Sequence, residues 1–155
     1  MKLLEKVLRT SLIVLVISMV ITCLWQVFTR FILLSPSKYT EEFLRYNLIW
    51  LTMLGIPYVH KSSKHIFLDI IVGKMDKRSN LRRMIVLELI ITVFSIIVFI
   101  IGGFMIVYNT RDQISAAMKI PMSFYYLPVL ISGIMMVIVS VNKIYKLISS
   151  LKGVK

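Results

Sequence analysis

Four stretches of this 155-residue chain contain no charged side chain, and their lengths constrain the fold more than any other feature. They cover residues 10–29, 46–60, 89–110 and 120–142, which is 20, 15, 22 and 23 residues. About 20 apolar residues in a helix cross a hydrocarbon core of roughly 30 Å. Three stretches reach that length, and the second does so when its polar flank is included. The pattern predicts an all-α integral membrane protein and excludes a soluble enzyme, a nucleic-acid-binding domain and a disordered chain.

The composition favours the same class of protein. Hydrophobic residues make up 58% of the chain and charged residues 17%, whereas a soluble domain is about 45–50% apolar and about 25% charged. A net charge of +12 would suggest nucleic acid in a soluble protein. Here the cations lie between and beside the apolar stretches, so we interpret them as topology signals and expect no nucleic-acid partner. Cys23 is the only cysteine, so no intrachain disulfide forms.

The chain is predicted to be a single domain, residues 1–155, with four membrane-spanning helices. Ser35-Pro36-Ser37 ends the first helix, because proline disfavours helical geometry in the residue before it. Pro57, after Gly55, is expected to kink the end of the second helix. The predicted spans are about 8–34, 41–59, 84–108 and 121–146.

The polar segment at residues 60–83 is expected to lie at the membrane surface. It holds seven Lys and Arg, and Ile66, Phe67, Ile70 and Ile71 recur in it at helical spacing, which predicts a short interfacial amphipathic helix. With four spans, this segment and both termini share one face, which holds 14 of the 19 Lys and Arg. Because cytoplasmic loops carry the excess of positive charge, both termini are predicted to be cytoplasmic.

Few residues within the spans have reactive side chains. Glu88 is the acid nearest a span, and we expect it to pair with Lys or Arg at the membrane surface, with proton coupling as the alternative. His60 and His65 have no further ligand nearby at metal-binding spacing. No nucleophile triad, phosphate-binding loop or zincin motif is present. We therefore expect no catalytic, cofactor-binding or metal-binding residue and no enzymatic activity.

Four charged residues cluster where the first two predicted helices meet. Arg30 lies near the end of the first helix, and Glu41, Glu42 and Arg45 open the second. Glu41 and Arg45 are four residues apart on one helical face, and Glu42 is expected to reach Arg30 across the hairpin. Unpaired charges at this depth are costly. We therefore predict an ion network that orders the hairpin, with a binding role as the alternative.

Polar and aromatic residues inside the first two spans predict a face that packs on protein. Trp25, Gln26 and Asn47 lie within the apolar stretches, where a lipid-facing amide has no hydrogen-bond partner. With only four helices in the chain, a second polypeptide is a reasonable partner for this face. Packing within the chain or against lipid remains the alternative.

Four motifs in this order and spacing resemble a known family. They are W-Q-V-F-T-R-F at 25–31, E-E-F-L-R-Y-N-L-I-W-L-T-M-L-G at 41–55, K-H-I-F-L-D at 64–69 and I-P-M-S-F-Y-Y-L-P-V at 120–129. With the four-span frame, they make the chain resemble the small membrane subunit of tripartite ATP-independent periplasmic (TRAP) transporters, the DctQ-like family. The resemblance covers nearly the whole chain and is weakest over 84–108.

The resemblance implies a multi-pass subunit of the bacterial inner membrane that imports organic acids together with two partners. These are a large multi-span membrane subunit, which carries the solute and sodium sites, and a periplasmic solute-binding protein. The small subunit would brace the large one and offer part of the docking surface. Arg30, Glu41, Glu42 and Arg45 would then order the hairpin and contact partners or lipid headgroups.

The resemblance also implies where the two polar connections lie. Residues 109–120 would lie at the periplasmic surface near the binding protein. Lys61, Lys64 and His65 would face anionic lipid on the inner side, where each cation contributes about 1 kcal/mol.

Two other functions remain open from the residues alone. An autonomous small multidrug- or ion-type exporter needs an essential membrane acid, and Glu88 is the candidate. A membrane-bound assembly or signalling factor would use the basic segment at 60–83 to bind lipid or a cytosolic protein.

Overall fold

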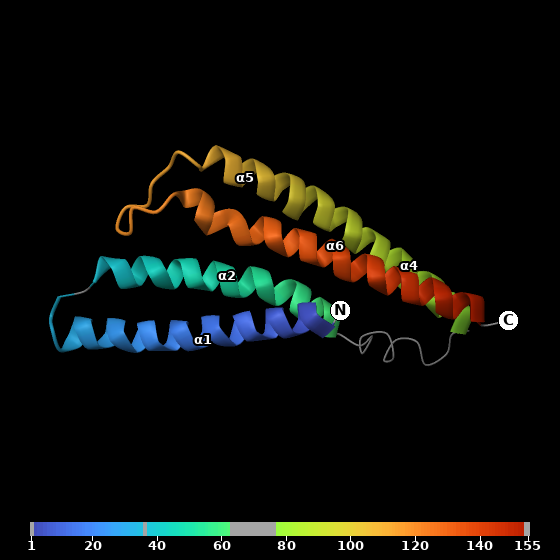
Figure 1. The fold of residues 1–155 in the computed structure, drawn as a ribbon, viewed down its shortest axis with the longest axis horizontal. Helices are drawn as coiled ribbons and strands as arrows, with labels where there is room; N and C mark the ends of the chain where they lie inside the picture. The colour runs from blue at the N-terminus through green and yellow to red at the C-terminus, as the bar shows by residue number, and fades with distance from the viewer. Residues whose placement is uncertain (1, 36, 63–76, 154–155) are drawn as a thin grey trace.

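The computed structural model describes residues 2–35, 37–62 and 77–153 and contains two helical hairpins (Figure 1). The first hairpin consists of α1 (Lys2–Phe31) and α2 (Lys38–Ser62). The predicted interfacial helix, with Lys64 and His65, lies outside the described residues. The second hairpin consists of one continuous helical rod, joined through residues 110–121 to α6 (Met122–Gly153). The rod is made of α4 (Lys77–Phe94), the π-helix η1 (Ser95–Gly102) and α5 (Gly103–Asn109).

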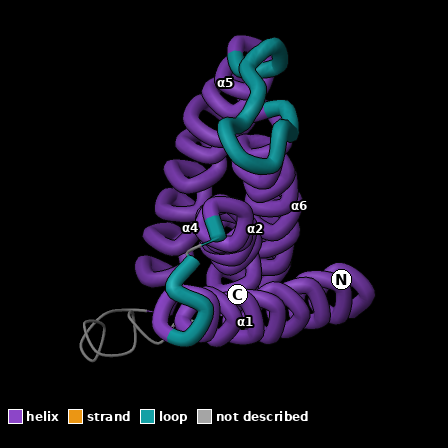
Figure 2. The backbone as a smooth tube through the Cα atoms, turned by 90° about the vertical axis from the view of Figure 1, so that its left-hand side faces the viewer, coloured by secondary structure: helices purple, strands orange, loops and turns teal. Residues whose placement is uncertain are grey.

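The helices form an open row rather than a closed bundle. Among the described helices, α1 packs only on α2, and α2 packs on α6. The rod of α4, η1 and α5 also packs on α6 and runs beside it, as the end-on view shows (Figure 2). The α2–α6 interface is therefore the main contact that joins the two hairpins.

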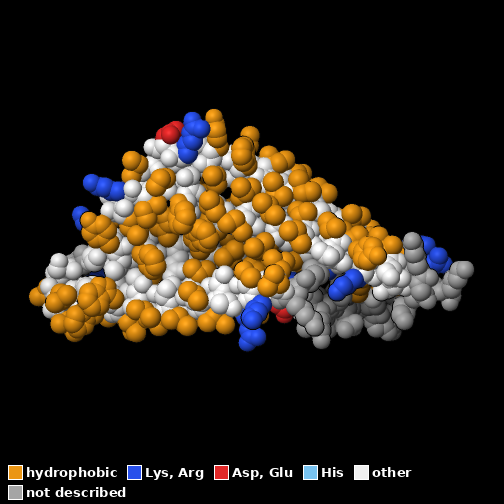
Figure 3. All heavy atoms as spheres, viewed as in Figure 1, with side chains coloured by type: hydrophobic (Ala, Val, Ile, Leu, Met, Phe, Trp, Pro, Cys, Tyr) orange, Lys and Arg blue, Asp and Glu red, His pale blue; other side chains and the backbone are white. Residues whose placement is uncertain are grey.

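Three of the helical segments are long and apolar enough to cross a membrane. They are Leu3–Phe31, Arg78–Asn109 and Met122–Leu151. Helix α2 has 25 residues but is more polar, because charged residues occupy both of its ends. Hydrophobic side chains cover much of the visible surface (Figure 3), which is the reverse of a soluble protein.

The helices differ from the predicted spans mainly at their ends. Helix α1 begins at Lys2 rather than near residue 8, and α6 continues to Gly153 rather than ending near residue 146. Hydrophobic patterning marks where a helix is apolar, whereas the backbone stays helical into the polar flanks. Helix α2 continues through Pro57 to Ser62 rather than ending near residue 59.

Close backbone packing joins α6 to the π-helix. An added Cβ at Gly133 would lie 2.6 Å from Cβ of Phe99, and one at Gly103 would lie 3.2 Å from the backbone nitrogen of Leu130. Ser95 of η1 and Ser132 of α6 are also fully buried. Small residues allow close helix approach where no hydrophobic effect drives association in lipid.

The glycine contact yields a stability prediction. Gly133→Ala is expected to lower the midpoint of thermal unfolding in detergent, because the new methyl group overlaps Phe99 and overpacking costs about 1–3 kcal/mol. Gly102→Ala is the matched control, since its Cβ would meet only a backbone oxygen at 3.7 Å. Alanine favours helix over glycine, so the control should be as stable as the wild type or more so. Equal midpoints for the two variants would contradict the close contact.

Candidate functional site

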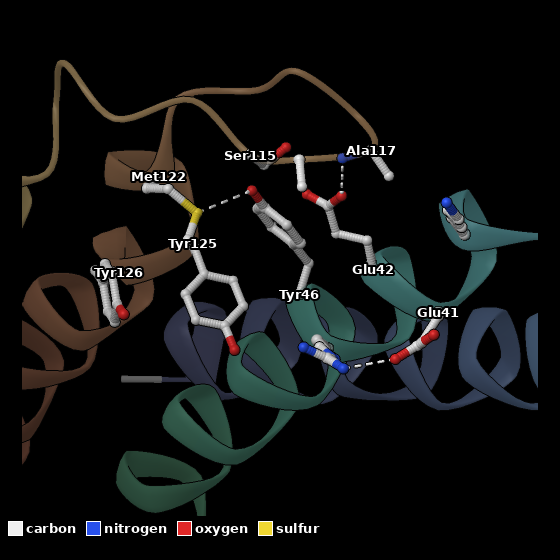
Figure 4. A pocket seen from close by; sticks show the side chains of 11 residues that line it. Glu41, Glu42, Tyr46, Ser115, Ala117, Met122, Tyr125 and Tyr126 are labelled. Carbon is white, nitrogen blue, oxygen red and sulfur yellow. Dashed lines mark hydrogen bonds and ion pairs between the residues drawn. The ribbon is translucent and has the colours of Figure 1, made fainter.

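At one end of the α2–α6 interface, Glu42 binds the connector, which we define as residues 110–121. Its Oε2 accepts hydrogen bonds from the backbone N–H groups of Ala117 (2.8 Å) and Met118 (3.0 Å). The side chain of Ser115 lies beside the same carboxylate (Figure 4). Glu42 thus ties the start of α2 to the loop that leads into α6.

The connector is folded so that its amides face Glu42. The N–H of Ser115 donates to the carbonyl of Ile120 (2.9 Å), and the N–H of Ile120 donates to Oγ of Ser115 (3.2 Å). Lys119 has a positive φ of 54°, which closes the turn between these two residues. The chain then enters α6, where Met122 donates its N–H to the carbonyl of Gln113 (2.8 Å).

Three tyrosines extend this contact along the α2–α6 interface. Tyr46 of α2 packs edge-on against Tyr125 of α6, with ring centroids 4.8 Å apart, and Tyr125 packs edge-on against Tyr126 at 5.0 Å. Tyr46 also points its hydroxyl at the sulfur of Met122, 3.9 Å away (Figure 4). These residues border an open cavity of about 520 Å³. Its charged lining residues are Lys38, Glu41, Glu42 and Arg45.

The predicted ion network is partly wrong. Glu41 and Arg45 form the expected pair, N···O 2.5 Å, on the exposed side of α2. Glu42 does not pair with Arg30, because its carboxylate is engaged by the connector amides. Arg30 is exposed, and its guanidinium lies 5.8 Å from the ring centroid of the adjacent Phe31. The connector, rather than the first helix, therefore supplies the partner of Glu42.

Trp25, Gln26 and Asn47, which were expected to share a protein-packed face, lie in different environments in the structure. Asn47 is buried between α1 and α2, where its Nδ2 donates to Oγ of Ser18 (2.7 Å) and to the carbonyl of Leu15 (3.1 Å). Asn47 thus contributes to packing within the chain. Trp25 is 53% exposed and stacks on Phe28, with centroids 5.7 Å apart. Gln26 is partly buried, one residue further along α1.

At the other end of the interface, a buried polar cluster joins α2, α4 and α6. Nε2 of His60 lies 3.1 Å from Oε2 of Glu88 and 3.1 Å from Oγ of Ser140. Nζ of Lys143 lies 3.3 Å from Oε1 of Glu88. We call these four residues the His60 cluster. A buried charge needs a partner. Because the partners lie on α2, α4 and α6, the cluster fixes how these three helices align along their axes.

Glu88 was expected to be a surface acid paired with Lys or Arg, and its predicted location is wrong. Glu88 does pair with a lysine, but it is only 5% exposed rather than a surface residue. Sequence reasoning missed the cluster because His60 and Lys143 are 28 and 55 positions away from Glu88. Their position at the ends of two apolar stretches was the available signal. Groups of three or more potential metal ligands are absent from the described part of the chain.

Lys61, expected to face lipid, makes a contact between helices instead. Its Nζ lies 2.8 Å from Oε2 of Glu5 in α1, and its side chain is 15% exposed. This pair joins the two helices of the first hairpin near the level of the His60 cluster. Glu5 was not among the predicted site residues.

The helices and their polar contacts identify the general class of this protein. Three long apolar helices, packed through small residues and joined by polar contacts at the ends of the α2–α6 interface, make this a membrane protein. The chain belongs to the family described as "Tripartite ATP-independent periplasmic transporters, DctQ component", which matches residues 19–150. It is therefore a small permease subunit of a TRAP transporter, as the motifs indicated.

A curated relative supports this assignment. The chain is 28% identical over 132 residues to the sialic acid TRAP transporter small permease protein SiaQ of Vibrio cholerae. The match covers 84% of this chain and 75% of that protein. An autonomous exporter and a signalling factor, the two other functions considered from the residues, are not favoured by these similarities.

The Glu42 contact predicts a specific change in the connector. Glu42→Ala removes the acceptor for two amides, and a hydrogen bond to a charged group contributes about 1.5–3 kcal/mol. We expect the amides of Ala117 and Met118 to exchange hydrogen about ten- to a hundredfold faster. Glu41→Ala is the matched control, because an exposed ion pair contributes only about 0–1 kcal/mol. Unchanged exchange in the Glu42 variant would contradict the contact.

The His60 cluster predicts non-additive effects of mutation. Glu88→Ala leaves the cation of Lys143 without its buried counter-charge, which costs about 3 kcal/mol and should lower the unfolding midpoint in detergent. Changing both residues, as Glu88→Leu with Lys143→Met, should restore much of the lost stability, because no unpaired charge remains. A double-mutant cycle of Glu88→Leu, Lys143→Met and both together measures the coupling. Purely additive effects would mean that the two side chains do not interact.

Proposed function

We propose that this chain is the scaffold subunit of a TRAP-type secondary transporter in the bacterial inner membrane. It braces a large multi-span membrane subunit, and its outer surface helps to dock a periplasmic solute-binding protein. The large subunit carries the solute and coupling-ion sites. The solute is an organic acid, the chemical class of the sialic acid named for the Vibrio relative. The chain has no enzymatic activity and needs no cofactor.

The observation that carries this proposal is the open row of helices. Because α1 packs only on α2 among the described helices, both faces of the row expose apolar side chains. On α1 alone, Leu24 and Phe31 are 66% and 69% exposed. Lipid covers part of this surface, and the transmembrane helices of the large subunit cover the rest. A flat apolar surface suits bracing, whereas a transport path requires polar groups enclosed between helices.

The spacing of the polar contacts on α2 supports a fourth membrane span. Glu42 and His60 are 18 positions apart, which is about 27 Å along a helix and close to the thickness of a hydrocarbon core. The residues from Tyr46 to His60 carry no formal charge. In this arrangement the two polar contacts lie at the two membrane surfaces, where they require least desolvation.

The positive charge of the chain supports one orientation of these four spans. Both termini and the segment at 60–83 are cytoplasmic, and the connector is periplasmic, near the binding protein. Two residues of that segment are proposed to lie close to anionic lipid at the inner surface: Lys64 and His65. Seven are proposed to order the hairpins or contact partners and lipid headgroups: Trp25, Gln26, Arg30, Glu41, Glu42, Arg45 and Asn47.

The pairing of Glu88 argues against an autonomous exporter. An essential proton-coupling acid must be free to exchange its proton with a solute or with water. Glu88 is engaged by both His60 and Lys143 and is 5% exposed. Its environment suits a structural ion pair, so the chain alone is not expected to move solute.

Reconstitution tests the proposal directly. Proteoliposomes containing this chain alone, the large subunit alone, or both are assayed for uptake of an organic acid presented by the binding protein. Uptake is expected only with both membrane subunits. In addition, Glu42→Ala should lower recovery of the two-subunit complex, because the connector it anchors forms part of the outer surface.

Two outcomes would contradict the scaffold function. One is uptake by the chain alone that is abolished by Glu88→Gln, which would establish an exporter-like mechanism. The other is capture of a cytosolic protein, with no multi-span partner, when the chain is isolated from its native membrane. Glu41→Ala serves as the control for complex recovery, since its pair with Arg45 is exposed.

A further inference from the structure

Two hollows lie on the same side of the α2–α6 interface, one beyond the other along the helices. The first is the cavity of about 520 Å³ at the connector end, and the second is an open groove of about 540 Å³. Lys38 and Arg45 line the first, and Thr52 and Val59 line the second. These four residues follow one another at intervals of seven, which is close to two helical turns, so they share one face of α2.

On helix α6, too, residues that line the two hollows share one face of the helix. Met122 borders the first cavity and Met136 borders the groove, and the two are 14 residues apart. Because 14 residues are close to four turns, both methionines also lie on one face. The cavity and the groove therefore lie along the same faces of α2 and α6, one beyond the other.

The cavity at the connector end is polar and balanced in charge. Lys38 and Arg45 contribute two positive charges, and Glu41 and Glu42 contribute two negative ones. Arg45 uses one nitrogen for Glu41, and its side chain is 68% exposed, so further donors of the guanidinium remain accessible. The tyrosine rings add faces that attract an ammonium group. A ligand with one phosphate and one ammonium complements this lining better than a net anion.

The groove is mainly apolar, with Ile56, Val59 and Met136 in its lining, and Thr52 and His60 are its polar members. Gly55 lies in it, and an added Cβ at Gly55 would meet no atom within 4 Å. Gly103 and Gly133, by contrast, are each covered by a neighbouring helix. The groove thus has room for a narrow apolar chain along the helix backbone.

The distance between the cavity and the groove indicates which kind of ligand would fit both. Arg45 and Gly55 are ten residues apart, which is about 15 Å along the helix and half the thickness of a hydrocarbon core. We propose that this surface binds one zwitterionic phospholipid, with its phosphate at Lys38 and Arg45, its ammonium at Glu41 and the tyrosines, and an acyl chain in the groove. This inference rests on α2 crossing the membrane, as proposed above, and does not depend on the partner subunits.

The experiment measures lipid retained by the full-length chain. The protein is purified in mild detergent, mixed with equal amounts of phosphatidylethanolamine, phosphatidylcholine and phosphatidylglycerol, and examined by native mass spectrometry. We expect one lipid per chain, with both zwitterionic lipids preferred over phosphatidylglycerol. Lys38→Gln with Arg45→Gln should weaken retention about tenfold, because the charge-assisted hydrogen bonds to phosphate are lost. Arg111→Gln is the control, since Arg111 lies over Tyr108 and does not line the cavity.

A second variant tests the groove independently of the headgroup. Gly55→Leu is expected to reduce retention because its side chain occupies the space of the acyl chain, while the chain itself has room to fold. If the double variant does not fold, this variant decides the matter. The recovery of the large subunit is measured in parallel. If Gly55→Leu abolishes that recovery and leaves lipid retention intact, the groove seats a protein helix and the proposal is wrong.

The remaining outcomes are equally decisive. Preference for phosphatidylglycerol, or retention unchanged in both variants, would overturn the lipid site and leave the scaffold function intact. In a Cys23→Ser background, labelling of Ser37→Cys from the same side as Ser62→Cys would place both ends of α2 on one side of the membrane. That result would refute the four-span arrangement itself and with it the lipid site.

Discussion

The packing of α2 against α6 is the contact on which the rest of this structure depends. Helix α1 is attached through α2, and the α4–α5 rod through α6, so the hairpins meet mainly at this interface. Apolar side chains fill its middle, where they give little directional preference in lipid. Polar groups at its two ends supply the direction: Glu42 binds the connector amides, and His60 binds Glu88 and Ser140. Together these contacts set how the two hairpins are rotated against each other and how they are aligned along the helix axes.

This arrangement explains why the protein suits a passive role in a larger complex. At the two ends of the α2–α6 interface, Glu42 is engaged by backbone amides, and His60, Glu88 and Lys143 are engaged with one another. Its apolar faces are left uncovered by its own helices. A row of this kind is rigid along the interface and available on its flanks, which are the properties that a brace for a larger membrane subunit requires.

The accuracy of the sequence-based interpretation depended on the distance between interacting residues. The pair of Glu41 and Arg45 was predictable because helical geometry alone brings residues four apart together. The partner of Glu42 was not, since the amides that bind it are 75 and 76 positions away and belong to an irregular loop. For the same reason Asn47, expected to face another polypeptide, proved to be bonded to α1 within the chain.

The sequence by itself determined the class of protein, the approximate position of the long helices that the structure describes, and the family. Hydrophobic length and short motifs are local properties, and lipid enforces the helical state wherever they occur. Only the tertiary structure decided that the helices form an open row, that Glu88 is buried with His60 and Lys143, and that two hollows align along α2 and α6. Those features depend on how helix faces are rotated against each other, which residue patterns along one chain do not specify.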